Sequence, residues 1–277
     1  MIEILYEAGP CLVVNKPSGL LTQAPSYIDS LERQIKDFLK EREHKPGNVY
    51  LGVPHRLDRP VSGTIVVCKH ARAARRMSEQ FESRTIRKIY HALVEGNVEE
   101  DSGTWTDYMR KIPDEAAAEF VAEDHPDARE AILHYRVLNR LLISNSVISS
   151  PASQSSTISS TTISPSISPS TISHLSPEVM ISDGSEPPAG FCLVTWLEIE
   201  LETGRMHQIR LQCGGRVHAI LGDAQYGSSI PFGESFEDVR MRGIALHAHQ
   251  LSFRHPMTHE PVEVIAPKPS TWQTFLP

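Results

Sequence analysis

The chain has 277 residues, of which 40% are hydrophobic and 22% charged, and its formal net charge is −7. No run of about 18 apolar residues occurs, which excludes a transmembrane helix and a membrane partner. The N-terminus lacks the basic and apolar regions of a signal peptide, which argues against secretion. Because the four cysteines are scattered without a C-x-x-C pair, we expect reduced thiols in a cytoplasmic protein.

Local sequence patterns predict three strands and one helix in the first third of the chain. Runs rich in β-branched residues, bounded by Gly and Pro, predict strands over residues 11–15 and 63–68. Apolar side chains recur every three to four positions over residues 71–84, which predicts a helix. Residues 88–95 return to a strand pattern.

A segment rich in Ser and Thr separates the next two predicted strands, over residues 131–138 and 192–201. Between Ser144 and Ser176, 19 of 33 residues are Ser or Thr, and the first charged residue after Arg140 is Glu178. Such a composition buries too little apolar surface to offset the entropy of ordering. We therefore expect residues 141–190 to form a disordered insertion.

The pattern near the C-terminus is ambiguous, because residues 245–251 fit either a helix or the edge of a strand. Strands outnumber helices over the whole chain, and no internal repeat is present. The sequence therefore predicts an α+β fold with a large, mixed, mostly antiparallel sheet in a single domain over residues 1–277.

Charge is segregated along the chain. Residues 55–91 carry nine Lys or Arg against three acids, a net charge of +6, whereas residues 95–130 carry a net charge of −9. Residues 203–218 contain three arginines and no acid. A polyanion responds to the local field, so two basic segments folded together would bind RNA despite the negative total. The alternative is ordinary charge on solvated surfaces.

The densest polar cluster is H-R-L-D-R-P-V-S-G over residues 55–63. Asp58 lies between Arg56 and Arg59 on a turn constrained by Pro54 and Pro60. Neighbouring cations keep a carboxylate ionised, which suits a nucleophile or an electrostatic stabiliser. The alternative is a turn stabilised only by ion pairs.

A second cluster, T-G-R-M-H-Q-I-R, covers residues 203–210. It brings Arg205, His207 and Arg210 within a few positions of one another, and arginine forks suit phosphate or carboxylate groups. Glycines follow at 214, 215, 222 and 227 and indicate tight turns or close backbone approaches.

These clusters, in this order, resemble the RluA-type pseudouridine synthase family over nearly the whole chain. Further motifs that carry the resemblance include Val13-Val14-Asn15-Lys16-Pro17-Ser18-Gly19-Leu20, Arg87-Lys88-Ile89-Tyr90, Gly222-Asp223 with Tyr226-Gly227, and Leu246-His247-Ala248. The family fold places flanking helices and a central cleft on the sheet. Only the Ser-rich insertion lies outside the resemblance. Met206 replaces the small hydroxyl residue that relatives commonly have.

The resemblance implies an isomerase (an intramolecular transferase) that converts uridine in RNA to pseudouridine by base flipping. Asp58 matches the catalytic aspartate, which attacks either the sugar or the base. Tyr90 matches the active-site tyrosine that stacks on uracil, although a strand tyrosine is equally an ordinary core residue. Arg210 matches the arginine that pairs with Asp58, and Arg205 competes for that role.

The resemblance also implies RNA contacts. Arg56 matches the arginine that enters the RNA stack when the target uridine is extruded, for which the alternative is a phosphate contact. We expect further RNA contacts from Arg205, His207, Lys88, Lys16 and Lys69. The chain begins almost directly at the catalytic domain, with no separate N-terminal RNA-binding module, which leaves rRNA and tRNA both open as substrates.

No cofactor or metal is expected. The pairs His247-x-His249 and His255-x-x-x-His259 lack an H-E-x-x-H context, and neither nucleotide-binding glycine motif is present. The isomerisation is redox-neutral and needs no nucleotide cofactor. We expect a monomer whose partner is RNA, engaged in rRNA or tRNA processing. The alternative function is a non-catalytic RNA-binding or chaperone module that retains the fold.

Overall fold

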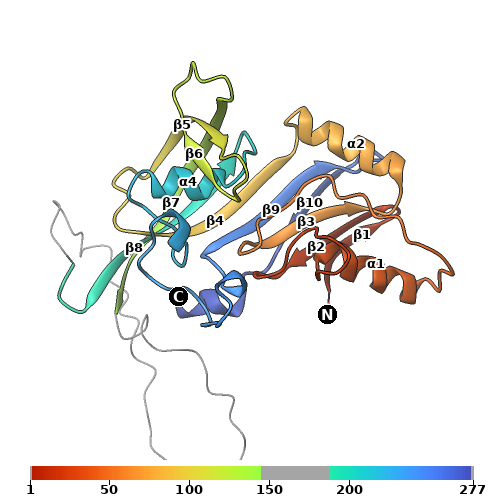
Figure 1. Cartoon of the computed structure of the whole chain (residues 1–277), viewed down its shortest axis with the longest axis horizontal. Coiled ribbons are helices and arrows are strands. Elements are labelled where there is room, and N and C mark those ends of the chain that lie inside the picture. Colours follow the sequence, from red (N-terminus) through yellow and green to blue (C-terminus); the bar gives the residue numbers. More distant parts are fainter. Residues whose placement is uncertain (1, 145–186, 276–277) are drawn as a thin grey trace, which may run out of the picture.

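The computed structural model describes residues 2–144 and 187–275. Over these residues ten strands form one sheet in the order β1-β2-β3-β9-β4-β8-β7-β5-β6, with β10 paired to β9 (Figure 1). Of the pairs between described strands, only β3 with β9 is parallel. The predicted α+β fold with a mixed, mostly antiparallel sheet is therefore confirmed. The strands are β1 (Glu3–Ala8), β2 (Cys11–Lys16), β3 (Ser62–Cys68), β4 (Arg87–Glu95), β5 (Ser102–Lys111), β6 (Ala118–Phe120), β7 (Arg129–Ser144), β8 (Phe191–Leu201), β9 (Leu246–Arg254) and β10 (Pro261–Ile265).

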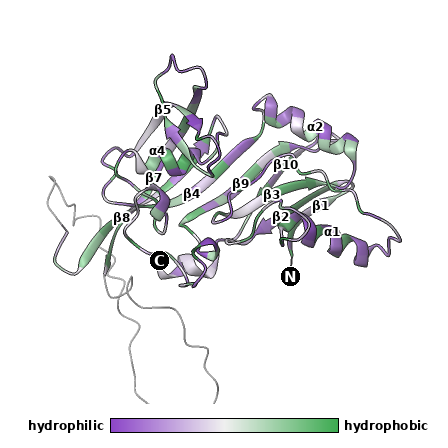
Figure 2. Ribbon diagram, viewed as in Figure 1, coloured by the Kyte–Doolittle hydropathy of each residue, from purple (hydrophilic) through white to green (hydrophobic). Residues whose placement is uncertain are grey.

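Strands β2 and β3 are buried on both faces, because helices α1 (Leu31–Arg42) and α2 (Ala71–Glu82) cover opposite sides of them. Side chains alternate along a strand. Accordingly Leu12 and Val14 pack in one cluster with α1, whereas Cys11 and Val13 pack in another with α2. Figure 2 shows both helices as ribbons of mixed hydropathy beside strands rich in hydrophobic residues.

Helix α2 lies within the predicted range of 71–84 but ends two residues earlier, at Glu82. The hydroxyl of Ser83 donates to the carbonyl of Glu79 at 2.7 Å, and Arg84 adopts a left-handed backbone with φ of 56°. Both features stop the helical repeat, since side-chain bonds to the backbone compete with helix continuation.

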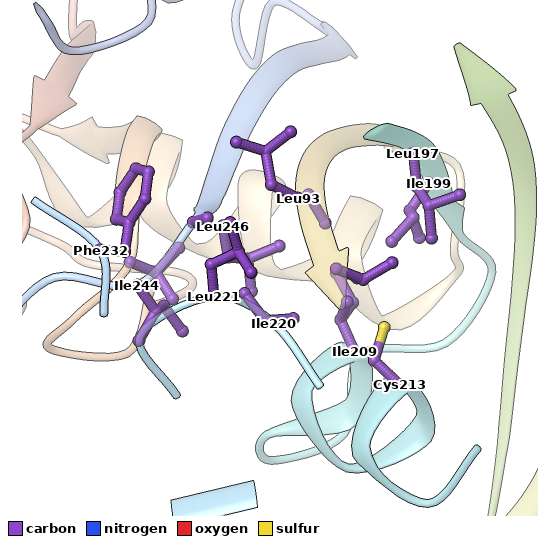
Figure 3. Packing of buried hydrophobic residues seen from close by; sticks show 14 of the residues in the cluster. Leu93, Leu197, Ile199, Ile209, Cys213, Ile220, Leu221, Phe232, Ile244 and Leu246 are labelled. Carbon is purple, nitrogen blue, oxygen red and sulfur yellow. The ribbon is translucent and has the colours of Figure 1, made fainter. Parts of the chain in front are cut away.

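The other half of the sheet packs against α4 (Gln208–Gly214), in which every residue from Gln208 to Cys213 is buried. Ile209 and Cys213 of this helix meet Leu93, Leu197 and Ile199 from β4 and β8, as Figure 3 shows. The same cluster continues to Leu221, Ile244 and Leu246 at the edge of β9. The short helix that begins at Gln208, inside the T-G-R-M-H-Q-I-R segment, is thereby fixed on the sheet.

One predicted boundary is wrong, and one ambiguous segment is a strand. Residues 141–144, assigned to the insertion, belong to β7, because Leu141, Leu142 and Ile143 continue the antiparallel register with β8 up to the pair Ser144 and Phe191. The rest of the predicted insertion falls mainly on residues 145–186, outside the described residues. The ambiguous residues 245–251 lie largely in strand β9, between β3 and β4.

All four cysteines are free thiols in the structure, and Cys11, Cys68 and Cys213 are buried. Among the helices described here, none is long and apolar enough to cross a membrane.

Candidate active site

Asp58 lies on a turn that enters strand β3. The hydroxyl of Thr22 donates to the carbonyl of Leu57 at 2.8 Å and accepts the Leu57 N–H at 3.2 Å. The Val61 N–H donates to the Asp58 carbonyl at 3.1 Å and closes the turn. The turn is thus pinned by its backbone, and the Asp58 side chain remains 26% exposed.

The arginines beside Asp58 in the sequence are not its partners in space, which corrects the sequence-based interpretation. The Arg59 Nε donates to the Gly19 carbonyl at 2.8 Å, and its Nη2 meets the sulfur of Met241. Arg56 is exposed. Consecutive side chains on a turn point in different directions, so adjacency in sequence does not bring their charges together.

The cation nearest to Asp58 is Arg210, from helix α4. Its Nη1 lies 3.6 Å from Asp58 Oδ2, whereas the Arg205 Nε donates to the Glu130 carbonyl. Of the two arginines left open by the sequence, Arg210 is therefore the one placed against the carboxylate. Its main partner is Asp223, which accepts from Nε at 2.6 Å and from Nη2 at 2.8 Å.

Burial disfavours the Arg210 cation, but the hydrogen bonds and charge of Asp223 outweigh that effect and raise the pKa of Arg210. Gln225 also accepts from Nη2 at 2.9 Å. Arg210 is therefore a permanently charged group held in a fixed orientation, with one nitrogen directed at Asp58.

His207 is the second group against Asp58, with Nε2 at 3.7 Å from Oδ2. Its Nδ1 lies 2.8 Å from the hydroxyl of Tyr226. Burial lowers the pKa of His207, although the charge of Asp58 opposes the shift. The imidazole is consequently neutral near pH 7.

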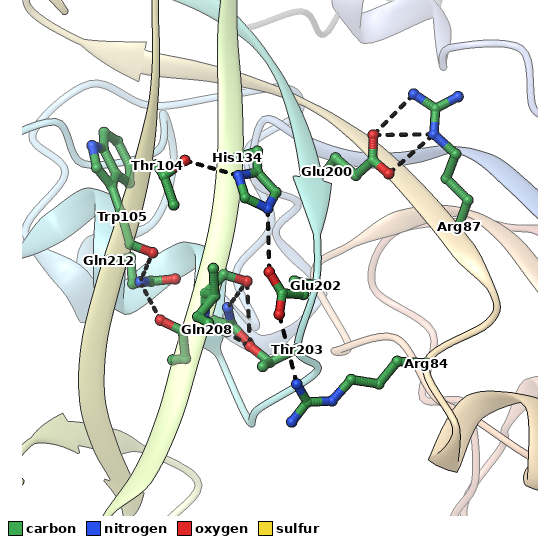
Figure 4. A network of polar contacts seen from close by, with 12 residues as sticks. Arg84, Arg87, Thr104, Trp105, His134, Glu200, Glu202, Thr203, Gln208 and Gln212 are labelled. Carbon is green, nitrogen blue, oxygen red and sulfur yellow. Dashed lines mark hydrogen bonds and ion pairs between the residues drawn. The ribbon is translucent and has the colours of Figure 1, made fainter.

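Hydrogen bonds of Gln208 fix the conformation of the segment that carries Arg205, His207 and Arg210. Figure 4 shows Gln208 beside Thr203. The amide oxygen of Gln208 accepts from the hydroxyl of Thr203 at 2.8 Å and from the N–H of Arg205 at 3.0 Å. Thr203 also accepts the Ile132 N–H from β7 at 2.8 Å. The turn between β8 and α4 is thus anchored to a neighbouring strand.

Tyr90 lines a cavity of about 480 Å³ that has Asp58 on its wall. Leu246 and Ile209 supply apolar surface, and both are nearly fully buried. Burial, with a contribution from the Asp58 charge, raises the pKa of Tyr90, so its phenol stays protonated at neutral pH. This combination gives a flat aromatic ring beside a carboxylate in a pocket with both polar and apolar walls, which suits a small heterocycle.

Basic side chains surround the same cavity. Lys88, Arg84 and Arg205 line it. Burial lowers the pKa of Lys88, and the charge of Arg84 adds to the shift. The cavity therefore combines a few apolar side chains with cations that suit a phosphate chain.

A second cavity, of about 490 Å³, meets the first at Asp58. Arg56 and His207 line both cavities, and Arg240 and Arg242 line only the second. Asp58 thus lines both cavities, as does the exposed Arg56.

The predictions for Lys16 and Lys69 are not supported by their positions, and both are corrected. Lys16 is fully buried, and its Nζ donates to the carbonyls of Pro17, Leu20 and Arg59. It stabilises the turn that holds Asp58 rather than facing a polyanion. Lys69 follows the far end of β3 and pairs with Glu7 at 2.7 Å.

Asp223 and Tyr226 are two site residues whose roles the sequence alone did not predict. Both belong to the Gly222-Asp223 and Tyr226-Gly227 motif that helped to establish the family resemblance, and that motif was the available signal. Asp223 is 1% exposed and holds Arg210, whereas Tyr226 contacts His207. Their roles depend on tertiary contacts.

His247, one of the histidines considered as metal ligands, has other partners. His247 Nδ1 lies 2.8 Å from the hydroxyl of Ser62, and its Nε2 lies 3.3 Å from the Ala266 carbonyl. Over residues 2–144 and 187–275, no group of three or more His, Cys, Asp or Glu is arranged to hold a metal ion.

The chain is similar to known proteins in sequence and in fold. The tRNA pseudouridine synthase C of Salmonella typhi is 29% identical over 277 residues, covering 100% of this chain and 89% of that protein. An RNA pseudouridine synthase of Synechocystis sp. is 27% identical, covering 99% of this chain and 68% of that protein. The structure of human RNA pseudouridylate synthase domain containing 1 shares the fold, with a TM-score of 0.63 and 22% identity over 99% of this chain and 86% of that one.

The sequence model of the RNA pseudouridylate synthase family matches residues 10–214, which include Asp58, Tyr90 and Arg210. Because this match spans most of the chain, the protein belongs to the RNA pseudouridylate synthase family and is a pseudouridine synthase.

Proposed function

We propose that the protein isomerises uridine in RNA to pseudouridine with the Asp58 carboxylate as nucleophile. The observation that supports this most directly is the surroundings of the carboxylate. Arg210 and His207 make their closest approaches to it at Oδ2, at 3.6 Å and 3.7 Å. Among the described residues, none donates a hydrogen bond to either carboxylate oxygen, so Asp58 lies beside a cation and remains available for attack.

The proposed reaction conserves all atoms. A carboxylate oxygen of Asp58 bonds to the nucleotide, at C1′ of the ribose or at C6 of the uracil, and the glycosidic bond between N1 and C1′ breaks. The uracil turns and forms a bond between C5 and C1′, which releases Asp58. C5 loses a proton, and N1 gains one. No oxidant or reductant is consumed.

Tyr90 and Arg56 have separate roles in this proposal. The protonated Tyr90 phenol stacks on the uracil inside the first cavity. Chemistry on a base requires extrusion from the stack, at a cost of a few kcal/mol. Arg56 is exposed where the two cavities join, and its planar guanidinium replaces the stacking that the extruded base gives up. Lys88 and Arg205 contact the phosphates.

We infer tRNA as the first substrate to test, with rRNA as the second. This choice rests on relatives named tRNA pseudouridine synthase C, one of which matches all of this chain. The proposal further assumes a cytoplasmic monomer that uses no nucleotide cofactor.

The test compares wild type with Asp58→Asn on tRNA and rRNA transcripts, with pseudouridine mapped chemically and RNA binding measured in parallel. We expect conversion only by the wild type and comparable binding by both proteins. Asn is nearly isosteric with Asp but lacks the nucleophilic charge. Equal conversion by the two proteins would refute the role of Asp58. Binding without conversion by the wild type would favour a non-catalytic RNA-binding module.

A further inference from the structure

His207 has an unusual backbone at the start of α4. Its φ of 53° and ψ of 24° are left-handed, and its side chain makes no capping hydrogen bond to the helix. For a residue other than glycine this conformation costs about 1 kcal/mol. Strain of this kind persists where surrounding contacts hold the residue in place. Here it directs an imidazole that is only 8% exposed between Asp58 and Tyr226.

The hydrogen bonds of Tyr226 determine the tautomer of that imidazole. The Tyr226 hydroxyl oxygen accepts the Ala118 N–H at 3.0 Å and lies 2.8 Å from His207 Nδ1. The hydroxyl has one proton to donate, and among the contacts of the described residues Nδ1 is its acceptor. A proton on Nδ1 would instead leave the tyrosine proton without an acceptor. Complete pairing therefore places the imidazole hydrogen on Nε2.

The Nε2–H is directed at the catalytic carboxylate. Nε2 lies 3.7 Å from Asp58 Oδ2, the oxygen that Arg210 also faces. Catalytic hydrogen bonds are often long before substrate binds and shorten in the complex. The opposite tautomer would present the lone pair of Nε2 to a carboxylate, which is repulsive.

We propose that His207 is a catalytic residue that donates a neutral Nε2–H hydrogen bond to Asp58 Oδ2 and so orients the nucleophilic carboxylate, and that Tyr226 is a positioning residue that fixes this tautomer. The proton stays on His207 throughout. This inference rests on the proposed function of Asp58, and it assigns His207 to the nucleophile rather than to an RNA contact.

A double-mutant cycle tests the role of Tyr226. The amide nitrogen of Gln reaches the position of imidazole Nε2 but has no tautomers. In the wild-type background, we expect Tyr226→Phe to lower the single-turnover rate about tenfold, or about 1.4 kcal/mol, with KM unchanged. In the His207→Gln background, the same substitution should change the rate less than about twofold, because the donor no longer depends on Tyr226.

The cycle separates this role from a structural one. Loss of the Tyr226 hydroxyl removes the acceptor of the Ala118 N–H in both backgrounds. A merely structural role therefore predicts equal losses in both, which would overturn the inference, as would an effect confined to KM. Thermal melting of each variant identifies any that fail to fold.

A readout independent of turnover keeps this inference distinct from the proposed function. Nitrogen NMR of ¹⁵N-histidine-labelled protein, with the His207→Gln spectrum for assignment, reports the protonated ring nitrogen directly. We expect Nε2–H in the wild type and a mixture of tautomers in Tyr226→Phe. An Nδ1–H wild type overturns the inference whatever the activity. An Nε2–H wild type that converts no uridine refutes the proposed function, and with it the catalytic role of His207, while the tautomer assignment stands.

Discussion

The pair between Arg210 and Asp223 allows the effect of one substitution to be worked out. Asp223→Asn removes the charge with little change of shape. Both side chains are nearly inaccessible, at 6% and 1% exposure. Removing one partner of a buried ion pair costs about 3–5 kcal/mol, because the other charge is left uncompensated. Asp58 and Gln225 remain within reach of Arg210, so we expect about 3 kcal/mol of lost unfolding free energy, near the lower limit.

The same substitution should slow catalysis. Without Asp223, Arg210 is free to turn further toward Asp58, from 3.6 Å to a direct hydrogen-bonded ion pair at about 2.8 Å. At an effective dielectric constant of about 20, this shortening strengthens the attraction by about 1.3 kcal/mol. Asp58 is 26% exposed, so we take about 1 kcal/mol, which corresponds to a decrease in kcat of roughly fivefold.

Urea unfolding at pH 7 measures the stability change, and single-turnover pseudouridine formation measures the rate. The matched control is Glu200→Gln, which breaks a bidentate pair with Arg87 at the surface, where the two side chains are 40% and 53% exposed. We expect the control to cost less than about 1 kcal/mol. If Asp223→Asn costs no more than the control and leaves the rate unchanged, the argument that Arg210 depends on Asp223 is wrong.

Two further predictions concern stability. Gly63 has φ of +118°, and a Cβ there would collide with the backbone of Ala248, where β3 meets β9. We expect Gly63→Ala to lower the free energy of unfolding in urea by more than about 3 kcal/mol. The control, Gly9→Ala, has a left-handed backbone but open space around it, and should cost about 1 kcal/mol. Burial lowers the pKa of His55 to about 3, of His91 to about 2 and of His247 to about 4, so the unfolded chain binds more protons below pH 6.5. This stabilisation is complete above pH 6.5 and is lost on acidification, by about 1.4 kcal/mol per pH unit for each histidine, until the folded pKa is reached. A urea midpoint at pH 5 equal to or above that at pH 7 would contradict the assignment of buried neutral imidazoles.

Local sequence patterns predicted the elements whose periodicity reflects burial. The spacing of three to four in residues 71–84 is the face that α2 packs on the sheet, and β2 and β3 read as apolar runs because helices cover both their faces. The pattern at 245–251 was ambiguous for a related reason. Strand β9 lies between β3 and β4, and several consecutive residues in it are buried. Its hydrophobic residues therefore do not show the alternation that distinguishes a strand from a helix in the sequence.

Residues of the site could be predicted only where the order of the motifs along the chain pointed to the family. Asp58, Tyr90 and Arg210 followed from the resemblance, and the structure brings them to one cavity. Lys16 was misassigned because its position in the sequence shows its charge but not the burial of its side chain. Three backbone carbonyls that converge on its ammonium are a tertiary arrangement. Asp223 is 13 positions from Arg210 and was missed for the same reason.

The charge distribution explains how an acidic protein serves a polyanionic substrate. Several cations of the basic segment 55–91 are neutralised by acids nearby, among them Lys69 by Glu7 and Arg87 by Glu200. At the cavities the balance differs. Arg56, Lys88 and Arg205 line them, and among the described ion pairs none joins these three to a carboxylate. An RNA phosphate approaching Asp58 therefore meets uncompensated cations first, and the net charge of −7 is an average over surfaces that it does not touch.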